Sequence, residues 1–457
     1  MLTWGATARA AESPRAVTLQ EARNYAREHQ PSVRASLARV AAAKADAAVP
    51  RAQWLPQLGA TAQLYVATTN NTTALYLNTP QVDAPRIGGT AAVDASHATF
   101  QPYGSTFAGV GVSQEVFDFG RIGAQASAAD ALVDVARHAS DTTTLDVDFA
   151  VEESFYAVLA AKGVLDASEQ AYDRTRTHRD FAKANVASGL FPPIELTRAE
   201  AQLARFDIAR IRARGGVTTS QAVLAAAVGA PDLTLDASGA LPAYQDVPTL
   251  RAAIEESASR DPRVREALAK VRAQEARTKA IFAEMRPDLS ATGTFSMRAG
   301  GAPPTSGISA DLNGWLPSVP NWDVGLVFTW PLYDATIVAR GRASEARAEA
   351  LREDVAALKQ ALTADVQRAY IAVEIARDAL PGLERAATAA VANYEQADAR
   401  FKAGLGTAIE IADAEALRAQ TEIDLALGKF DLAKARAQLD RAIARNLEKR
   451  ALAAPER

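Results

Sequence analysis

The stretch from Asp118 to Ser188 constrains the fold of this chain more than any other. It contains no proline, and its only glycines are Gly120, Gly123 and Gly163. As one continuous helix it would be roughly 100 Å long, at about 1.5 Å per residue. Charged residues recur along it, which excludes a helix that spans a membrane. We therefore expect it to pack lengthwise against other helices, as in a coiled coil or a tubular bundle.

The size and composition of the chain narrow the classes of protein further. A length of 457 residues exceeds one ordinary core, so several domains or one elongated body are expected. The net charge is −4 and no basic patch stands out, which argues against a nucleic-acid partner. The absence of cysteine excludes thiol catalysis, cysteine metal sites and lipidation on an N-terminal cysteine. No run of about 18 apolar residues predicts a transmembrane helix.

The two ends of the chain are expected to lie outside the folded body. The run Ala8-Arg9-Ala10 resembles the small-residue end of a secretory signal, although the apolar core that should precede it is missing. We interpret residues 1–15 as the remnant of a signal peptide or as a disordered tail. Residues 447–457 are expected to form a C-terminal tail.

The sequence repeats itself, with residues 16–241 as a first repeat and 242–446 as a second. Near the start of each repeat, Thr18-Leu19 matches Thr249-Leu250 at an offset of 231 residues. Near the end, Gly189-Leu190 matches Gly404-Leu405 at an offset of 215. The difference lies between Pro287 and Asp334, where the second repeat has the shorter loop. Insertions are tolerated in such loops.

Each repeat is expected to contain the same elements in the same order. Short helices open it, followed by a β-hairpin, a long helix and a returning helix. In the first repeat the predicted bounds are 57–117 for the hairpin, 118–188 for the long helix and 194–228 for the returning helix. In the second repeat they are 288–332, 333–403 and 408–445, in the same order. The second long helix contains Pro381-Gly382, which should kink or break it.

The four predicted strands alternate between apolar and polar residues over about ten positions, which is the pattern of an outer-membrane strand. A soluble half-buried hairpin has the same pattern, but two hairpins at equivalent positions of a repeat favour the membrane. Four strands cannot close a membrane barrel, and open edges are not tolerated in lipid. The chain must therefore oligomerise. A trimer would pool twelve strands around a channel, whereas a dimer would pool eight and fill its own interior.

The sequence also resembles the TolC-like outer-membrane efflux channels over nearly its whole length. The resemblance rests on the Thr-Leu-x-x-Ala openings, on Pro56-Gln57-Leu58, and on the run from Phe117 to Arg121. Its most family-like stretch runs from Arg400 to Thr407 and continues into Ile409–Asp413. The chain lacks the arginine and the tyrosine with which some members brace a closed tip, because Gly406 and Phe401 stand at those positions.

The resemblance implies the fold, the cellular location and the partners. The fold would be an α+β membrane protein, a homotrimer with a 12-stranded β-barrel in outer-membrane lipid and a long periplasmic α-helical barrel. Members work with a periplasmic adaptor protein and an inner-membrane pump of the RND or ABC type. Together they expel drugs, solvents or ions, or secrete proteins. The helical turns would dock the adaptor through Gly189, Leu190, Gly404, Leu405, Gly406 and Thr407.

The resemblance further places Glu410 and Asp413 at the constriction of the pore. The two acids are three residues apart and share a helix face, so three chains would form a ring of carboxylates that concentrates cations. The alternative is that acids in a first helical turn complement the helix dipole. Glu195 occupies the equivalent position in the first repeat. Phe401 is expected either to pack at the gate or to belong to the core.

An enzymatic reading finds no support in the sequence. The chain has four histidines and none of them forms a metal-spaced pair, so we expect no metal site, no cofactor and no catalytic residue. The run Gly404-Leu405-Gly406 follows a helix and lacks the third glycine of a phosphate-binding loop. The rival to a passive exit duct is a soluble coiled-coil scaffold or periplasmic adaptor. Apolar strand faces distinguish the two, because a scaffold has no use for lipid-facing strands.

Overall fold

The computed structural model describes residues 15–67, 78–79, 82–83, 103–242, 247–300 and 319–445. The signal remnant, except Arg15, most of the predicted polar loops and the C-terminal tail lie outside these residues. The chain divides into two compact units, each taking segments from both halves of the sequence. One contains Met1–Val40, Val135–Leu268 and Glu353–Arg457, and the other contains Ala41–Asp134 and Ala269–Arg352. We call them the helical unit and the sheet unit and describe each by itself.

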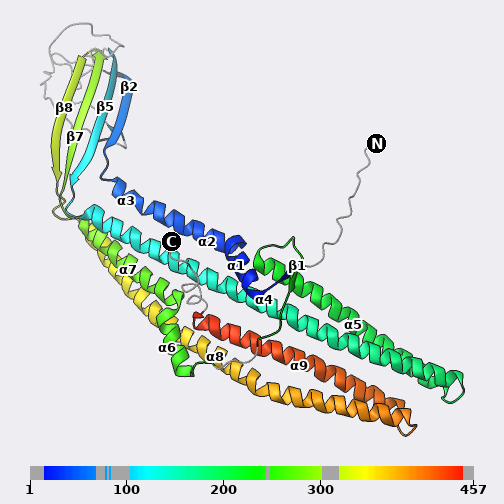
Figure 1. Ribbon diagram of the computed structural model, residues 1–457. Helices are drawn as coiled ribbons and strands as arrows, with labels where there is room; N and C mark the ends of the chain where they lie inside the picture. Colours follow the sequence, from blue (N-terminus) through cyan, green and yellow to red (C-terminus); the bar gives the residue numbers. More distant parts are fainter. Residues whose placement is uncertain are drawn as a thin grey trace, which may run out of the picture. The chain divides into compact units, whose positions relative to one another are not determined.

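The sheet unit is built on a four-stranded antiparallel sheet in the order β2-β5-β7-β8 (Figure 1). These strands span Gln57–Ala67, Tyr103–Phe117, Asp288–Gly300 and Val319–Thr329. A two-residue pair, β3 (Asn78–Thr79) and β4 (Val82–Asp83), lies in the connection between β2 and β5. Within the described residues, β2 and β8 each have a neighbour on one side only, so both edges of the sheet are open.

One face of this sheet is apolar and exposed. Register places Leu58 opposite Val112, and Val112 lies in the same row as Val324 of β8. All three side chains are exposed, as are Leu64, Val66, Val110, Phe295, Leu326 and Phe328. The alternate residues of β2, such as Thr61, point to the opposite face because side chains alternate along a strand. A contiguous apolar face of this kind marks a surface that is covered by another molecule or by lipid.

Aspartates start the two long helices, α4 (Arg121–Ala187) and α8 (Ala335–Lys402). Asp118 accepts hydrogen bonds from the amides of Gly120, at 2.9 Å, and Ile122. Asp334 accepts from the amides of Thr336, at 2.7 Å, and Ile337, at 3.3 Å. A side chain that accepts these free amides fixes where each helix begins.

The helices of the sheet unit pack through small residues. This unit holds α3 (Ala48–Ala52) with the ends of α2 (Pro31–Asp46) and α7 (Pro262–Ala283). A Cβ atom added at Gly341 would lie 2.3 Å from the Phe282 ring, so the ring of α7 lies directly over this glycine of α8. Beside it, Gln274 donates to the Ser344 hydroxyl at 2.7 Å. Such contacts let the two helices approach closely.

The helical unit combines a short parallel strand pair with antiparallel helices. The strands are β1 (Arg15–Val17) and β6 (Leu235–Ala237), and α1 (Leu19–His29) follows β1. Besides the parts of α4 and α8 that belong to it, this unit contains α5 (Pro193–Val228), α6 (Leu250–Arg260) and α9 (Ala408–Ala442). The connections α4–α5 and α8–α9 are tight turns, so these helices run back along each other (Figure 1).

Three apolar clusters form the core of the helical unit, and the smallest contains Ala171, Phe206 and Ala419. The largest contains Val151 and Val158 of α4, Leu224 of α5 and Ala433 of α9, all buried. The second contains Val366 of α8 and Leu439 of α9, with Ala253 of α6. None of the described helices is long and apolar enough to cross a membrane.

A kink or a break was predicted at Pro381-Gly382, and the break does not occur, because the helix α8 continues through Pro381. Proline lacks an N–H group and therefore removes one hydrogen bond from the helix interior. Ala387 and Ala390 on the following turns are buried, so the helix stays packed beyond the proline. Most helical stability in proteins comes from packing of this kind.

Candidate functional site at the helical turns

The turn between α4 and α5 is closed by hydrogen bonds back to the end of α4. The amides of Leu190 and Phe191 both donate to the carbonyl of Asn185, at 2.8 and 3.2 Å. The amide of Gly189 donates to the carbonyl of Val186 at 3.1 Å. Gly189 has φ = +79°, which a side chain would strain. This arrangement is typical of a helix that ends at a left-handed glycine.

The turn between α8 and α9 has the same pattern 215 residues later. The amides of Leu405 and Gly406 donate to the carbonyl of Arg400, at 2.9 and 3.1 Å. Gly404 has φ = +74° and occupies the position of Gly189. Thr407 then caps α9 by accepting from the amide of Glu410 at 3.3 Å. The two turns are therefore built in the same way.

Both turns expose a large apolar side chain at the equivalent position. Leu190 is 73% exposed and Leu405 is 75% exposed. Ile194 and Ile409 begin the returning helices four residues later, and both are also exposed. The sequence predicted the two leucines as turn residues, but it did not single out the isoleucines. Their signal was available, because Ile194-Glu195 and Ile409-Glu410 are one of the repeated pairs.

Phe401 is the buried member of an aromatic cluster that joins the two turns. Its side chain is only 6% exposed. Its ring lies 5.8 Å from those of Phe181, at the end of α4, and Phe191, in the first turn. The imidazole of His178 packs edge-on against it, with ring centroids 4.9 Å apart. In one chain, therefore, Phe401 packs between the two hairpins.

The predicted constriction residues lie on the first turns of α5 and α9. Glu410 and Asp413 are both exposed. The Glu410 carboxylate lies 4.0 Å from the Arg400 guanidinium, across the turn. Glu195 is partly buried and accepts from Arg198 at 3.2 Å. Thr407 caps α9, so neither carboxylate is needed as the cap. Both acids are exposed, and Glu410 also faces the Arg400 guanidinium.

An ion-pair network one to three turns deeper was not predicted from the sequence. Glu415 of α9 is 3% exposed, and Arg174 of α4 donates to both of its carboxylate oxygens. Arg174 also reaches Glu422 at 3.3 Å, and Arg418 holds the same carboxylate at 2.9 Å. The ring of Tyr394 lies beside the two guanidinium groups. The network ties α4 to α8 and α9.

Burial shifts the pKa values of several groups in this region. Desolvation raises the pKa of Glu415 above its ordinary value, although Arg174 opposes this. Desolvation of Arg174 acts to lower its pKa. The hydrogen bonds and the negative charge of Glu415 outweigh this effect, so the pKa of Arg174 is raised. Burial raises the pKa of Tyr394 to about 12. Burial lowers the pKa of His178, against the nearby carboxylates of Asp398 and Glu195.

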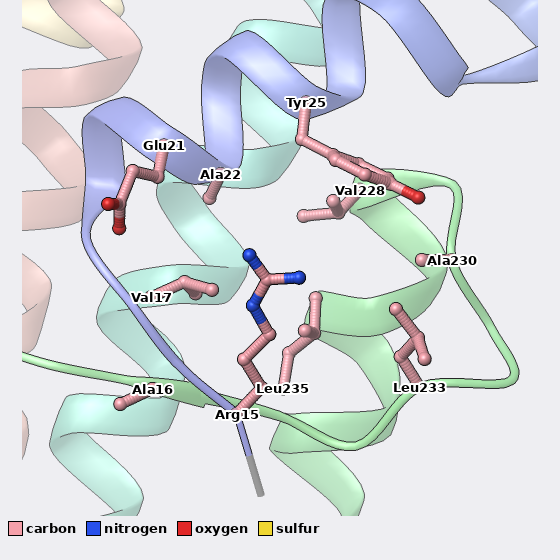
Figure 2. Close-up of a pocket in the computed structure, with 10 residues that line it drawn as sticks. All are labelled: Arg15, Ala16, Val17, Glu21, Ala22, Tyr25, Val228, Ala230, Leu233 and Leu235. Carbon is pink, nitrogen blue, oxygen red and sulfur yellow. The ribbon is translucent and has the colours of Figure 1, made fainter.

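The cavities of the helical unit include two of clearly different size. Figure 2 shows the smaller, of about 140 Å³, where Arg15 points into a space lined by Val17, Val228 and Leu235. That volume is close to the volume of a cavity that holds one benzene molecule, so the space has room for one ring-sized group. The larger, of about 360 Å³, lies between α5 and α9, close to where these helices begin. No group of three or more metal-ligating side chains was found among the described residues.

A family model places this geometry among known proteins. The model of the outer membrane efflux proteins matches residues 22–230 and again 253–445. The chain therefore belongs to the outer membrane efflux protein family, and the predicted resemblance to the TolC-like channels is confirmed. The two matches begin 231 residues apart and end 215 residues apart. These are the same offsets that separate the repeated motifs of the sequence.

Solved structures share the fold of the whole chain. The outer-membrane channel OprN has a TM-score of 0.72 at 19% identity, covering 93% of this chain and 89% of its own. The outer-membrane channel CmeC of Campylobacter jejuni has a TM-score of 0.72 at 14% identity, covering 94% and 88%. The MtrE channel of Neisseria gonorrhoeae, solved in an open state, has a TM-score of 0.68 at 18% identity, covering 93% and 88%. No curated protein sequence gave a significant match.

Proposed function

We propose that this protein is a passive exit duct in the outer membrane, serving a tripartite efflux system or a type I secretion system. It carries small molecules such as drugs, solvents or ions, or proteins, from a periplasmic adaptor and an inner-membrane RND or ABC pump to the exterior. The observation that carries this proposal is the exposed apolar face of an open four-stranded sheet, in a chain of the outer membrane efflux family.

The open edges of the sheet support a trimer. β2 and β8 each have an unpaired edge within the described residues, and unpaired backbone groups are costly in lipid. Pairing β8 of one subunit with β2 of the next satisfies both edges. Three subunits then close a 12-stranded barrel whose apolar face, including Leu64 and Leu326, contacts lipid. The long helices α4, α5, α8 and α9 of the three chains form the periplasmic tube.

The two helical turns are the docking surface for the adaptor in this proposal. Leu190 and Leu405 project from equivalent backbone positions, and each is followed by an exposed isoleucine. Exposed apolar side chains at matching positions suit a partner that contacts both hairpins in the same way. Gly189, Gly404 and Gly406 shape the turns, and Thr407 caps the helix that follows the second one.

The constriction of the duct is proposed at Glu410 and Asp413, with Glu195 as a weaker contributor. Six exposed carboxylates from three chains would attract cations and repel anions. Glu195 is less available, because Arg198 neutralises it within the same helix. The soluble scaffold alternative is not favoured, because the family consists of outer membrane proteins and the apolar strand face would then have no use.

The test is single-channel conductance of the purified protein in a planar bilayer. Wild type should conduct with cation selectivity, and Glu410→Gln/Asp413→Asn should lose most of that selectivity. The matched control is Glu353→Gln/Asp431→Asn, which removes the same two charges per chain from exposed positions elsewhere on α8 and α9.

Two results would contradict parts of the proposal. Equal selectivity in the wild type and in the Glu410→Gln/Asp413→Asn variant would remove these acids from the constriction and leave the channel intact. A protein that stays soluble and monomeric without detergent, and that never conducts, would overturn the channel itself.

A further inference from the structure

The larger cavity of the helical unit lies between α5 and α9, at the first turns after the two hairpins. Its volume is about 360 Å³, and His178 of α4 contributes to its wall. Gln202 of α5 donates to the carbonyl of Ala412 of α9 at 3.1 Å, which holds the two helices together beside it. Small-molecule sites in proteins usually have volumes of about 300 to 1,000 Å³. The cavity is open to solvent, since Arg198, Ala201 and Arg205 in its wall are exposed, and its volume lies in the range of ligand sites.

The charge that lines this cavity is positive. Arg198 and Arg205 stand two turns apart on α5, so both side chains lie on the face that meets α9. Arg198 has one ion pair, with Glu195 at 3.2 Å. In the described part of the chain, Arg205 has no ion-pair partner. The guanidinium of Arg205 is thus wholly available to a ligand, and that of Arg198 is partly available.

No carboxylate lines the cavity from the opposite helix. The lining residues of α9 are Ala408, Ile409 and Ala412. Glu410 lies about a third of a turn from Ile409, because successive residues are about 100° apart. Asp413, four residues after Ile409, lies nearer to the cavity, but neither acid is among the residues that line it.

The remaining walls of the cavity are apolar and short. Ala199 and Ala201 of α5 face Ala408 and Ile409 of α9. Short side chains leave the space open, and their methyl groups offer contact to an apolar body but no hydrogen bond. Two guanidinium donors beside an apolar wall match a molecule with an anionic group at one end and a ring or alkyl body at the other.

We propose that the cavity between α5 and α9 is a binding site for small organic anions, held by Arg198 and Arg205 through a carboxylate or sulfonate. Guanidinium groups bind such planar or tetrahedral anions through paired hydrogen bonds. Because the site lies within one chain, its existence does not depend on the proposed channel activity. Binding can therefore be measured even where conductance is absent.

The experiment is calorimetric titration of the full-length protein in detergent with 1-naphthoate, against a protein-free micelle blank at low salt. Arg205→Gln should weaken binding at least about tenfold, and Arg198→Gln/Arg205→Gln further, because each removes a charge-assisted contact. The control Arg212→Gln removes an exposed arginine of α5 outside the cavity and should leave the affinity unchanged. The neutral 1-naphthalenemethanol should bind at least about tenfold more weakly than 1-naphthoate.

A second pair of variants tests the space rather than the charge. Ala201→Phe fills the cavity without removing a donor and should abolish binding of 1-naphthoate. Ala204→Phe adds the same ring at an exposed position of α5 that does not line the cavity, and it should bind as wild type. Thermal melts of both variants show whether the fold is retained.

Four results would overturn the proposal. These are unchanged affinity in Arg198→Gln/Arg205→Gln, unchanged affinity in Ala201→Phe, equal binding of the alcohol, or equal weakening in Arg212→Gln. Binding of an acidic peptide without binding of 1-naphthoate would also overturn it, because the site would then serve a protein partner.

Discussion

The guanidinium of Arg174 holds both carboxylate oxygens of Glu415 through its Nε atom, at 3.1 and 3.0 Å. The two residues are 241 positions apart and join α4 of one hairpin to α9 of the other. Breaking such a buried pair leaves an uncompensated charge and is far costlier than losing a surface pair.

We expect Arg174→Met to destabilise the helical unit near the turns by about 3–5 kcal/mol, because Glu415 stays buried without its partner. Hydrogen exchange of the amides around Glu415 measures the change. Arg174→Met/Glu415→Gln should recover part of the loss, since the buried charge is gone. A loss below about 1 kcal/mol in the single variant would show that water replaces the guanidinium freely.

A pH dependence is expected from His178. Burial lowers the pKa of its imidazole in the folded protein. As pH falls below about 6.5, the unfolded chain binds this proton first, so the free energy of unfolding decreases. The loss is complete once the pH lies below the folded-state pKa. Above pH 7 this residue causes no change.

The variant His178→Phe keeps a ring beside Phe401 and cannot titrate. Between pH 7.5 and pH 5 its melting temperature should fall less than that of the wild type, and thermal melts in detergent measure the difference. Equal decreases in the two proteins would assign the pH dependence to other groups.

The third prediction concerns Phe401, which packs against Phe181 and Phe191. Phe401→Ala should cost about 3–5 kcal/mol, as a buried phenylalanine does when it is truncated. Both turns should then be cleaved faster by protease, because the ring contacts both hairpins. The control Leu405→Ala truncates an exposed side chain and should change the cleavage rate little. Faster cleavage of only one turn would contradict a shared cluster.

The fourth prediction tests which face of the sheet meets lipid. The chain has no cysteine, so a single fluorophore can be attached at a chosen site. A label on Leu64→Cys, on the exposed apolar face, should be strongly quenched by brominated lipid. A label on Thr61→Cys, on the opposite face of the same strand, should not. Equal quenching at both sites would contradict a sheet with one lipid-facing side.

Local chemistry explains which features could be predicted from the sequence. A long stretch without proline predicted α4, and the internal repeat predicted α8. Gly189 and Gly404 stand at the turns because glycine adopts their backbone conformation without strain. Alternation of apolar and polar residues predicted the strands, since the two faces of a strand meet different surroundings. Pro381 does not break α8, because packing around a helix can outweigh one missing hydrogen bond.

The sequence by itself determined the order of the elements, the positions of the turns and the membership in the outer membrane efflux family. Only the tertiary structure decided the pairing of Arg174 with Glu415, the packing of Phe401 between two hairpins, and the cavity that Arg198 and Arg205 share with α9. These features join residues on different helices. Which residues meet there depends on how each helix is rotated against its neighbours, and a periodic pattern of small residues such as alanine leaves that rotation open.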